Sequence, residues 1–306
     1  MNAQAYREII RSKIPEGTVI PRHTDWQHLY EVVPVGRIFK SVTTRLQVLK
    51  DESLINYKMN RALDYIFANY SQFNDANIME HIDIASKQSG IILEDAGDIG
   101  TAIHGYREDY FNKWIEIGAR PKNALDFVPP EQEDVRATSA MRGLQNFCID
   151  KDYIPVITEQ LVYDVEHEVA GTLDDVGLMR VVKREGDPGC KHEIIVDPKF
   201  AHRCLLCDRK YVYELVLMDL KTSNQFKDHY FFQVALYYMM FVKLTGLKPK
   251  RCFILKVSKE DGSYKIEELY QIGTLVRYAK AMLRTNQGLD FIRSVRKDNQ
   301  RDVLKI

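Results

Sequence analysis

The sequence predicts an α/β protein in which a mixed central sheet is flanked by helices. Three observations lead to this fold class. Apolar residues recur at helical spacing over most of the chain before Tyr153, and from that residue the period changes to that of strands. The third observation is a run from Tyr213 to Leu220 that is apolar on both faces. Such a strand is typical of the centre of a sheet that helices cover on both sides.

Helices are expected wherever apolar residues recur every three to four positions. These segments are Ala3–Lys13, Ser41–Asn69 with Ser41 as the N-cap, Ala76–Ser89, a helix opening at Gly100, Gln132–Phe147, His229–Leu244 and Thr274–Arg296. Because glycine interrupts helices, Gly90, Gly97 and Gly100 are expected to separate the third helix from the fourth. Extended segments are expected at Leu29–Val35, Val156–Tyr163, Glu168–Met179, Tyr213–Lys221, Arg251–Val257 and Tyr264–Tyr270.

We expect three regions along the chain. Residues 1–95 form a helical N-terminal region that covers the site, and residues 96–275 form the core, which carries a cysteine-containing insert at 180–210. Residues 276–306 form a C-terminal helix and a basic tail.

Composition restricts the partners and the compartment. The formal net charge of +0 over 306 residues means that any nucleic-acid surface must be a local basic patch. Five cysteines without a secretory segment indicate a reducing compartment, and no apolar run reaches the ~20 residues that span a bilayer. We therefore expect a cytoplasmic protein with no membrane partner.

The strand at Tyr213–Lys221 ends in an acid and a lysine two residues apart. Strand side chains alternate, so Asp219 and Lys221 share one face. Burying a carboxylate and an ammonium is unfavourable unless they serve each other, a metal or a substrate. A structural ion pair is the alternative to a catalytic site, and the rest of the sequence has to decide between them.

Four further motifs accompany this pair in a fixed order. They read Gly100-Thr-Ala-Ile-His104, an isolated Glu159, Gly171-Thr-Leu-Asp174, then Asp219-Leu-Lys-Thr222 itself, and Gln233-Val-Ala-Leu-Tyr237. This series resembles the RecB-like branch of the PD-(D/E)xK nuclease superfamily, and most closely its phage-type and stand-alone exonucleases. The match covers about half the chain, and each motif falls on the expected kind of element.

The resemblance implies a restriction-endonuclease-like core and a role for each motif residue. Metal ligands for Mg²⁺ or Mn²⁺ would be His104, Asp174, Asp219, the main-chain carbonyl of Leu220 and Glu159. Lys221 would act beside the attacking water, so that Lys221, Asp219, Asp174 and Glu159 form the catalytic set. Gln233, Tyr237, Thr222 and Ser223 would contact the substrate.

Each motif residue also has a purely structural explanation. A histidine such as His104 is often a satisfied residue of a helix, and Glu159 can face solvent on an edge strand. Tyr237 lies in an aromatic-rich helix, where packing is the usual role. Because Asp174 and Asp175 are adjacent on a strand, we expect only one of them to join a given site.

The insert before the buried strand carries ligands of the type that bind structural zinc. Cys190, His192, Cys204 and Cys207 supply three sulfurs and one imidazole, with His202 as a rival ligand, and reduced cysteines are the alternative. Some RecB-like nucleases hold an iron–sulfur cluster with one cysteine before the core and three after it. This chain lacks that pattern, so we predict no cluster, and it also lacks a P-loop.

We therefore expect a metal-dependent exonuclease that acts on DNA ends or single strands in recombination, repair or phage DNA processing, with a separate helicase or recombination protein as a partner. A structure-specific or restriction-type endonuclease on the same core is one alternative. A catalytically silent nucleic-acid-binding protein of the same fold is the other.

Overall fold

The computed structural model describes residues 2–24, 28–46, 49, 52–74, 76–130, 134–180, 213–223 and 226–303, with only the backbone at 52–55 and 296–303. The chain folds as two compact units. The first comprises Met1–Val48 and Tyr106–Ile306, and the second comprises Leu49–Gly105. The expected cysteine site at Cys190–Cys207 lies outside the described residues.

An eight-stranded mixed sheet forms the centre of the first unit, so the predicted α/β class is confirmed. Its strands are β1 (Val19–Pro21), β2 (Leu29–Val32), β3 (Arg37–Ser41), β4 (Tyr153–Asp164), β5 (Val169–Arg180), β6 (Tyr213–Lys221), β7 (Arg251–Val257) and β8 (Tyr264–Glu268). They follow the order β1-β2-β3-β5-β6-β7-β8, and β4 pairs with β5. The pairs β3–β5 and β6–β7 are parallel, and the others are antiparallel.

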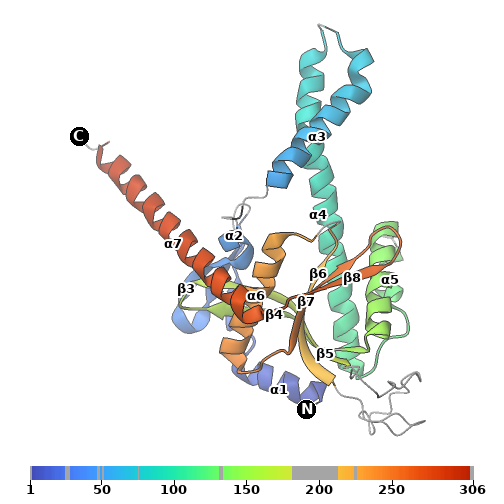
Figure 1. The fold of residues 1–306 in the computed structure, drawn as a ribbon, viewed down its shortest axis with the longest axis vertical. Coiled ribbons are helices and arrows are strands. Elements are labelled where there is room, and N and C mark those ends of the chain that lie inside the picture. Colours follow the sequence, from blue (N-terminus) through green and yellow to red (C-terminus); the bar gives the residue numbers. More distant parts are fainter. Residues whose placement is uncertain are drawn as a thin grey trace. The chain divides into compact units, whose positions relative to one another are not determined.

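Helices pack on this sheet (Figure 1). They are α1 (Ala3–Lys13), α2 (Val42–Leu46), α5 (Val135–Asp150) and α6 (Asp228–Thr245), while α7 (Ile272–Val303) packs on α2 and α6. Short 3-10 turns lie at Val33–Val35 and Ala124–Phe127, and a third, Tyr70–Gln72, belongs to the second unit. The helix α6 connects β6 to its parallel neighbour β7, and both α5 and α6 pack on β4 and β7. None of the described helices has both the length and the apolar character needed to cross a membrane.

The buried strand and its crossover helix have the predicted form. In β6, Leu215 to Leu220 are all buried, because β5 and β7 flank the strand and helices cover it. Helix α6 ends at Gly246, whose left-handed backbone (φ 74°) turns the chain toward β7, as glycine permits without strain.

The N-terminal region differs from the expectation of a helical segment over 1–95. Residues 19–41 contribute three strands to the central sheet, and the residues before Leu49 pack with the first unit. Of the three strands, β2 lies within the extended segment expected at Leu29–Val35, but β1 and β3, of three and five residues, have too few positions for their period to be told from that of a helix. Ser41 does cap a helix as predicted, since its hydroxyl accepts a hydrogen bond from the Thr44 amide, but that helix, α2, ends at Leu46.

The second unit contains α3 (Glu52–Asn69) and most of α4 (Ile78–Ile117). Helix α4 runs through Gly90, Gly97 and Gly100 without a break, so the expected division into two helices is wrong. A glycine inside a helix costs about 0.5–1 kcal/mol relative to alanine, which the apolar contacts of a 40-residue helix outweigh. Within the helix, the hydroxyl of Thr101 donates to the carbonyl of Gly97.

Candidate metal centre

Asp174 and Asp219 lie on neighbouring strands where the pairing of β5 and β6 begins, close enough for the carboxylate of Asp174 to add to the effect of burial in raising the pKa of Asp219. The register places Asp175 opposite Met218, so the next position along each strand brings Asp174 opposite Asp219. The main-chain amide of Leu220 donates to Oδ2 of Asp174 over 2.7 Å. The predicted convergence of these two acids is therefore present, and it follows from the strand pairing. For Leu220 the structure defines a role for the amide, while its carbonyl as a metal ligand remains a prediction.

Glu159 reaches the same place from β4. Its backbone has a φ of 49°, in the left-handed region that non-glycine residues seldom adopt. Such strained residues are common at functional sites, where the surrounding structure holds them. The carboxylate of Glu159 forms an ion pair with Arg107 and is about three-quarters buried, so it does not lie free in solvent on the edge strand.

Arg107 on α4 is the centre of the cluster, and sequence reasoning missed it. Its side chain is 0% exposed, and besides Glu159 it contacts Asp174 (Nη1 to Oδ2, 3.4 Å) and Asp175 (Nη1 to Oδ2, 3.0 Å). One guanidinium thus contacts both neighbouring acids of β5, although only Asp174 belongs to the group of possible metal ligands with His104 and Glu159. The long side chain of Arg107 and its several N–H groups allow one guanidinium to contact two adjacent carboxylates of the strand. The available signal was an arginine in an otherwise apolar helical stripe with Tyr110, Phe111 and Trp114, all of which are buried.

Lys221 forms an ion pair with Asp219, the contact that the structural alternative expects. Its Nζ lies 2.6 Å from Oδ2 of Asp219 and 5.1 Å from the ring centroid of Tyr230. Burial lowers the pKa of Lys221, but the carboxylates of Asp219 and Asp174 raise it more, so this lysine stays protonated. Among the described residues, the buried Oδ1 of Asp219 has no hydrogen-bond partner. A fully buried carboxylate oxygen without a partner is unfavourable unless something further binds it.

The acidic cluster carries an excess of two negative charges. We define it as Glu159, Asp174, Asp175 and Asp219 with the two cations Arg107 and Lys221. Four carboxylates against two cations leave a charge of −2 when all are ionised. Burial raises the pKa of Glu159 to about 8, of Asp175 to about 7 and of Asp219 to about 6, and neighbouring carboxylates contribute. One divalent cation would neutralise this excess, so the donor set fits such an ion.

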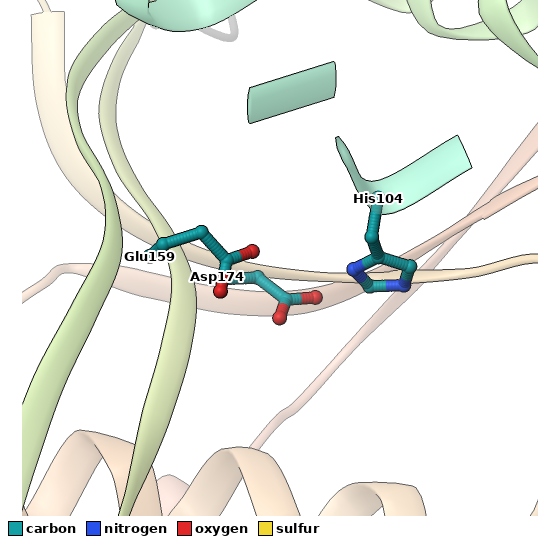
Figure 2. Close-up of side chains that lie close together, drawn as sticks. All are labelled: His104, Glu159 and Asp174. Atoms are coloured by element: carbon teal, nitrogen blue, oxygen red, sulfur yellow. The ribbon is translucent and has the colours of Figure 1, made fainter. Parts of the chain in front are cut away.

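His104 lies one helical turn before Arg107 on α4. One ligand atom each from His104, Glu159 and Asp174 lie within 4.8 Å of one another (Figure 2). Ligand atoms around one divalent cation lie about 3–4 Å apart at bond lengths of about 2.1 Å, so this spacing is compatible with coordination. Asp219 is not part of that group, and its Oδ2 lies 2.6 Å from Nζ of Lys221.

Gln233 and Tyr237 lie together on α6 and are both buried. Nε2 of Gln233 donates to the hydroxyl of Tyr237 over 3.5 Å, and a Cβ on Gly171 would meet the Tyr237 ring at 3.0 Å. Gly171 thus leaves the space that the tyrosine ring occupies. Tyr237 therefore packs in the core as well as lying near the acids. In the loop after β6, Ser223 accepts a hydrogen bond from Tyr230 over 3.3 Å, and Thr222 is half-buried.

Replacing Gly171 by alanine is expected to destabilise the protein by about 1–3 kcal/mol, because the added methyl group pushes against the buried ring of Tyr237. Gly90→Ala is the matched control: its Cβ would meet nothing within 4 Å, and alanine favours the helix by about 0.5–1 kcal/mol. Urea unfolding measures both changes. Equal effects of the two substitutions would contradict the contact.

The raised carboxyl pKa values predict a pH dependence in the metal-free protein. Acids whose folded-state pKa is raised bind protons more tightly when folded, so their contribution is present below about pH 4 and is lost as pH rises through the folded values. In EDTA, the free energy of unfolding is therefore expected to fall between pH 4 and pH 8. Asp164 acts oppositely, since its pKa is lowered by Lys243 and His167 despite its burial, but that change falls below this range.

Urea unfolding at several pH values in EDTA measures this slope. Asp175→Asn removes one of the three titrating carboxyls and is expected to flatten it. A stability that stays constant or rises over pH 4–8 in the wild-type protein would contradict the charge assignment.

Comparisons with known proteins do not show a family. No family model matches the chain, and no curated protein matches it. Among solved structures that resemble it is one titled "Crystal structure of SSO0001", at 12% identity and a TM-score of 0.22, covering 60% of this chain and 74% of that one. A likeness of this size carries no argument about function.

Proposed function

We propose that this protein is a metal-dependent nuclease with a PD-(D/E)xK core, which hydrolyses phosphodiester bonds at DNA ends or in single strands. The observation that carries the proposal is the acidic cluster, whose carboxylates come from β4, the middle of β5 and the end of β6. It combines a charge of −2 when all its carboxylates are ionised, a buried carboxylate oxygen that has no partner among the described residues, and a lysine 2.6 Å from Asp219. Structural ion pairs alone do not require that excess charge.

The donor set favours Mg²⁺ or Mn²⁺. Carboxylate oxygens from Asp174, Glu159 and Asp219 are hard ligands, and the imidazole of His104 shifts the preference toward Mn²⁺. The bound cation would lower the pKa of a water and stabilise negative charge on the phosphate during attack. Structural zinc at the cysteine insert and the absence of an iron–sulfur cluster stay predictions from the sequence.

Residues of the chain then position the reactants. The ammonium of Lys221, held by Asp219, offers protons to hydrogen-bond the attacking water or a phosphate oxygen. Arg107 fixes Glu159 and Asp174 by ion pairs, so both carboxylates keep their places before substrate binds. Gln233 and Tyr237 support the back of the site from α6.

Charge also bears on where DNA would bind. The second unit, residues 49–105, contains four basic and nine acidic residues, a net charge of −5. Such a segment repels phosphates, so we expect the DNA backbone to be held by the first unit.

The test is digestion of end-labelled single- and double-stranded DNA with Mn²⁺, Mg²⁺ or EDTA. Wild type is expected to cut in Mn²⁺ and to be inactive in EDTA. Asp219→Asn should lose at least about 10³-fold in rate, because it removes a ligand and the partner of Lys221. Asp261→Asn, in the exposed turn before β8, is the matched control. DNA left intact under all conditions would refute the proposal.

Closed circular single-stranded DNA separates an exonuclease from an endonuclease on the same core, since only an endonuclease cuts it. A catalytically silent nucleic-acid-binding protein is the second candidate. The ion pairs of Arg107 and Lys221 favour it, because they satisfy part of the cluster without metal. Calorimetric titration distinguishes the two, since a silent protein need not bind Mn²⁺ through Asp174.

A further inference from the structure

A cavity of ≈ 300 Å³ lies beside β4 in the first unit. It is lined by Arg11 and Ile14 at the end of α1, by the loop leading into β1, by Asn112 and Ile115 on α4, and by residues 156–161 of β4. Of the described strands, only β5 pairs with β4, so β4 is an edge strand here. Edge strands present unpaired main-chain donors and acceptors along their outer side.

The cavity and the acidic cluster have one residue in common, Glu159. Glu159 lines the cavity and is also the residue whose carboxylate pairs with Arg107. Its neighbour Thr158 also lines the cavity, and its hydroxyl donates to the main-chain carbonyl of Asp174 over 3.2 Å. The left-handed backbone of Glu159 lies at this junction. Glu159 therefore borders both the cavity and the acidic cluster, so a DNA strand whose phosphodiester lies at the cluster has the cavity next to it along β4.

The lining has the chemistry of a site for a neutral, planar, polar group. Its formal charges are one arginine and one glutamate, Arg11 and Glu16, apart from Glu159, whose charge Arg107 offsets. A site without net positive charge is poorly suited to a phosphate. The amides of Asn112 and Gln160 can hydrogen-bond the edge of a base, and aliphatic side chains can contact its faces. The Gln160 amide is held in place, since its Nε2 donates to the Leu161 carbonyl over 2.9 Å.

Size limits the occupant to one base. Small-ligand cavities range from about 300 to 1,000 Å³, so this one lies at the lower end. A base inside a duplex is stacked and paired, and it must leave the helix to enter such a pocket, which costs a few kcal/mol. An unpaired base enters without that cost.

We propose that this cavity binds the unpaired nucleobase next to the scissile phosphate, and so selects single strands or frayed ends. The inference rests on the proposed nuclease function and adds a position-specific base requirement to it. The site is assigned to the first unit alone, because every residue that lines it belongs to that unit.

The experiment measures binding rather than cleavage. The probes are a labelled oligothymidylate and a series in which one residue at a time is abasic, with Ca²⁺ replacing Mn²⁺ to slow cleavage. Wild type is expected to bind the intact strand about tenfold more tightly than the strand that is abasic at one particular position, and to bind the others nearly equally. Asn112→Trp places a large side chain at the cavity and should abolish this difference. Lys113→Trp, the next residue on α4 and not part of the lining, is the matched control and should keep it.

The outcomes separate the two proposals. Equal binding of all abasic strands by wild type, or a difference that survives in Asn112→Trp, would overturn the base site even if the protein cuts DNA. A position-specific loss that Asn112→Trp abolishes supports the base site even if no cleavage occurs, and then the nuclease proposal alone fails. A wild-type protein that binds none of the strands overturns the base site.

Discussion

Arg107→Met is expected to lower the free energy of unfolding by about 3–5 kcal/mol in EDTA. The substitution leaves Glu159, Asp174 and Asp175 buried without their shared cation, and removing one partner of a buried ion pair typically costs this much. Because a protein of this size has a total stability of about 5–15 kcal/mol, the variant would be strongly destabilised at neutral pH. Urea unfolding in EDTA, followed by circular dichroism, measures the change.

Two further variants show whether charge is the cause. Asp175→Asn in the Arg107→Met background removes one of the uncompensated carboxylates and should recover part of the lost stability. Arg37→Met is the matched control, since Arg37 is 53% exposed and pairs with Glu168 at the surface, where such pairs contribute less than about 1 kcal/mol. Equal losses for Arg107→Met with and without Asp175→Asn would show that packing, not charge, explains the effect.

A divalent cation should partly replace the missing guanidinium. Arg107→Met raises the excess charge of the acidic cluster from −2 to −3, so Mn²⁺ is expected to stabilise this variant more than it stabilises wild type. Thermal unfolding with increasing Mn²⁺ tests this. A smaller shift in the variant would indicate that Arg107 organises the ligands as well as neutralising them.

Lys221→Met is expected to slow DNA cleavage by about 10²–10⁴-fold while leaving Mn²⁺ binding in place. The lysine offers its charge and protons to the reacting groups, and a positioned acid–base group contributes a factor of this size. Methionine retains the apolar length of the side chain. Initial rates at saturating Mn²⁺ and calorimetric Mn²⁺ titration measure the two properties separately.

The neighbouring strand supplies the control for this lysine. Lys256 on β7 pairs in register with Lys221, and its Nζ lies over the ring of Phe226. Lys256→Met removes a cation of the same kind from the adjacent position and should reduce the rate much less. If Lys221 only forms a structural pair, its substitution will lower the rate no more than the loss of folded protein accounts for.

Local patterns in the sequence were sufficient for the elements of the core. The buried strand β6, the crossover helix α6 and the antiparallel pair β4–β5 are placed as predicted, because each is long and strongly periodic. Of the three short N-terminal strands, β2 lies within the extended segment expected at Leu29–Val35, while β1 and β3 were not predicted. Helix α4 was divided at its glycines, because a local signal cannot show the packing that keeps such a helix continuous.

For the candidate site too, the sequence identified some residues and only the structure showed the others. Chain order identified Asp174, Asp219 and Lys221, since two of them share one strand and the third lies on the strand paired with it. The sequence did not identify Arg107, because its partners lie on other elements, 52 or more residues away in the chain. The left-handed backbone of Glu159 and the cavity beside it also have no signature in the sequence.

By itself, the sequence determined the α/β class, the central strand and the identity of the acids and the lysine at its end. These depend on side-chain period and residue type, which neighbouring residues display. The tertiary structure alone decided that these charges are buried together, that Arg107 neutralises only part of them, and that a cavity adjoins Glu159. The net charge of the cluster and the cavity both depend on residues that are distant in the chain. They are therefore defined only when the strands have paired and the helices have packed.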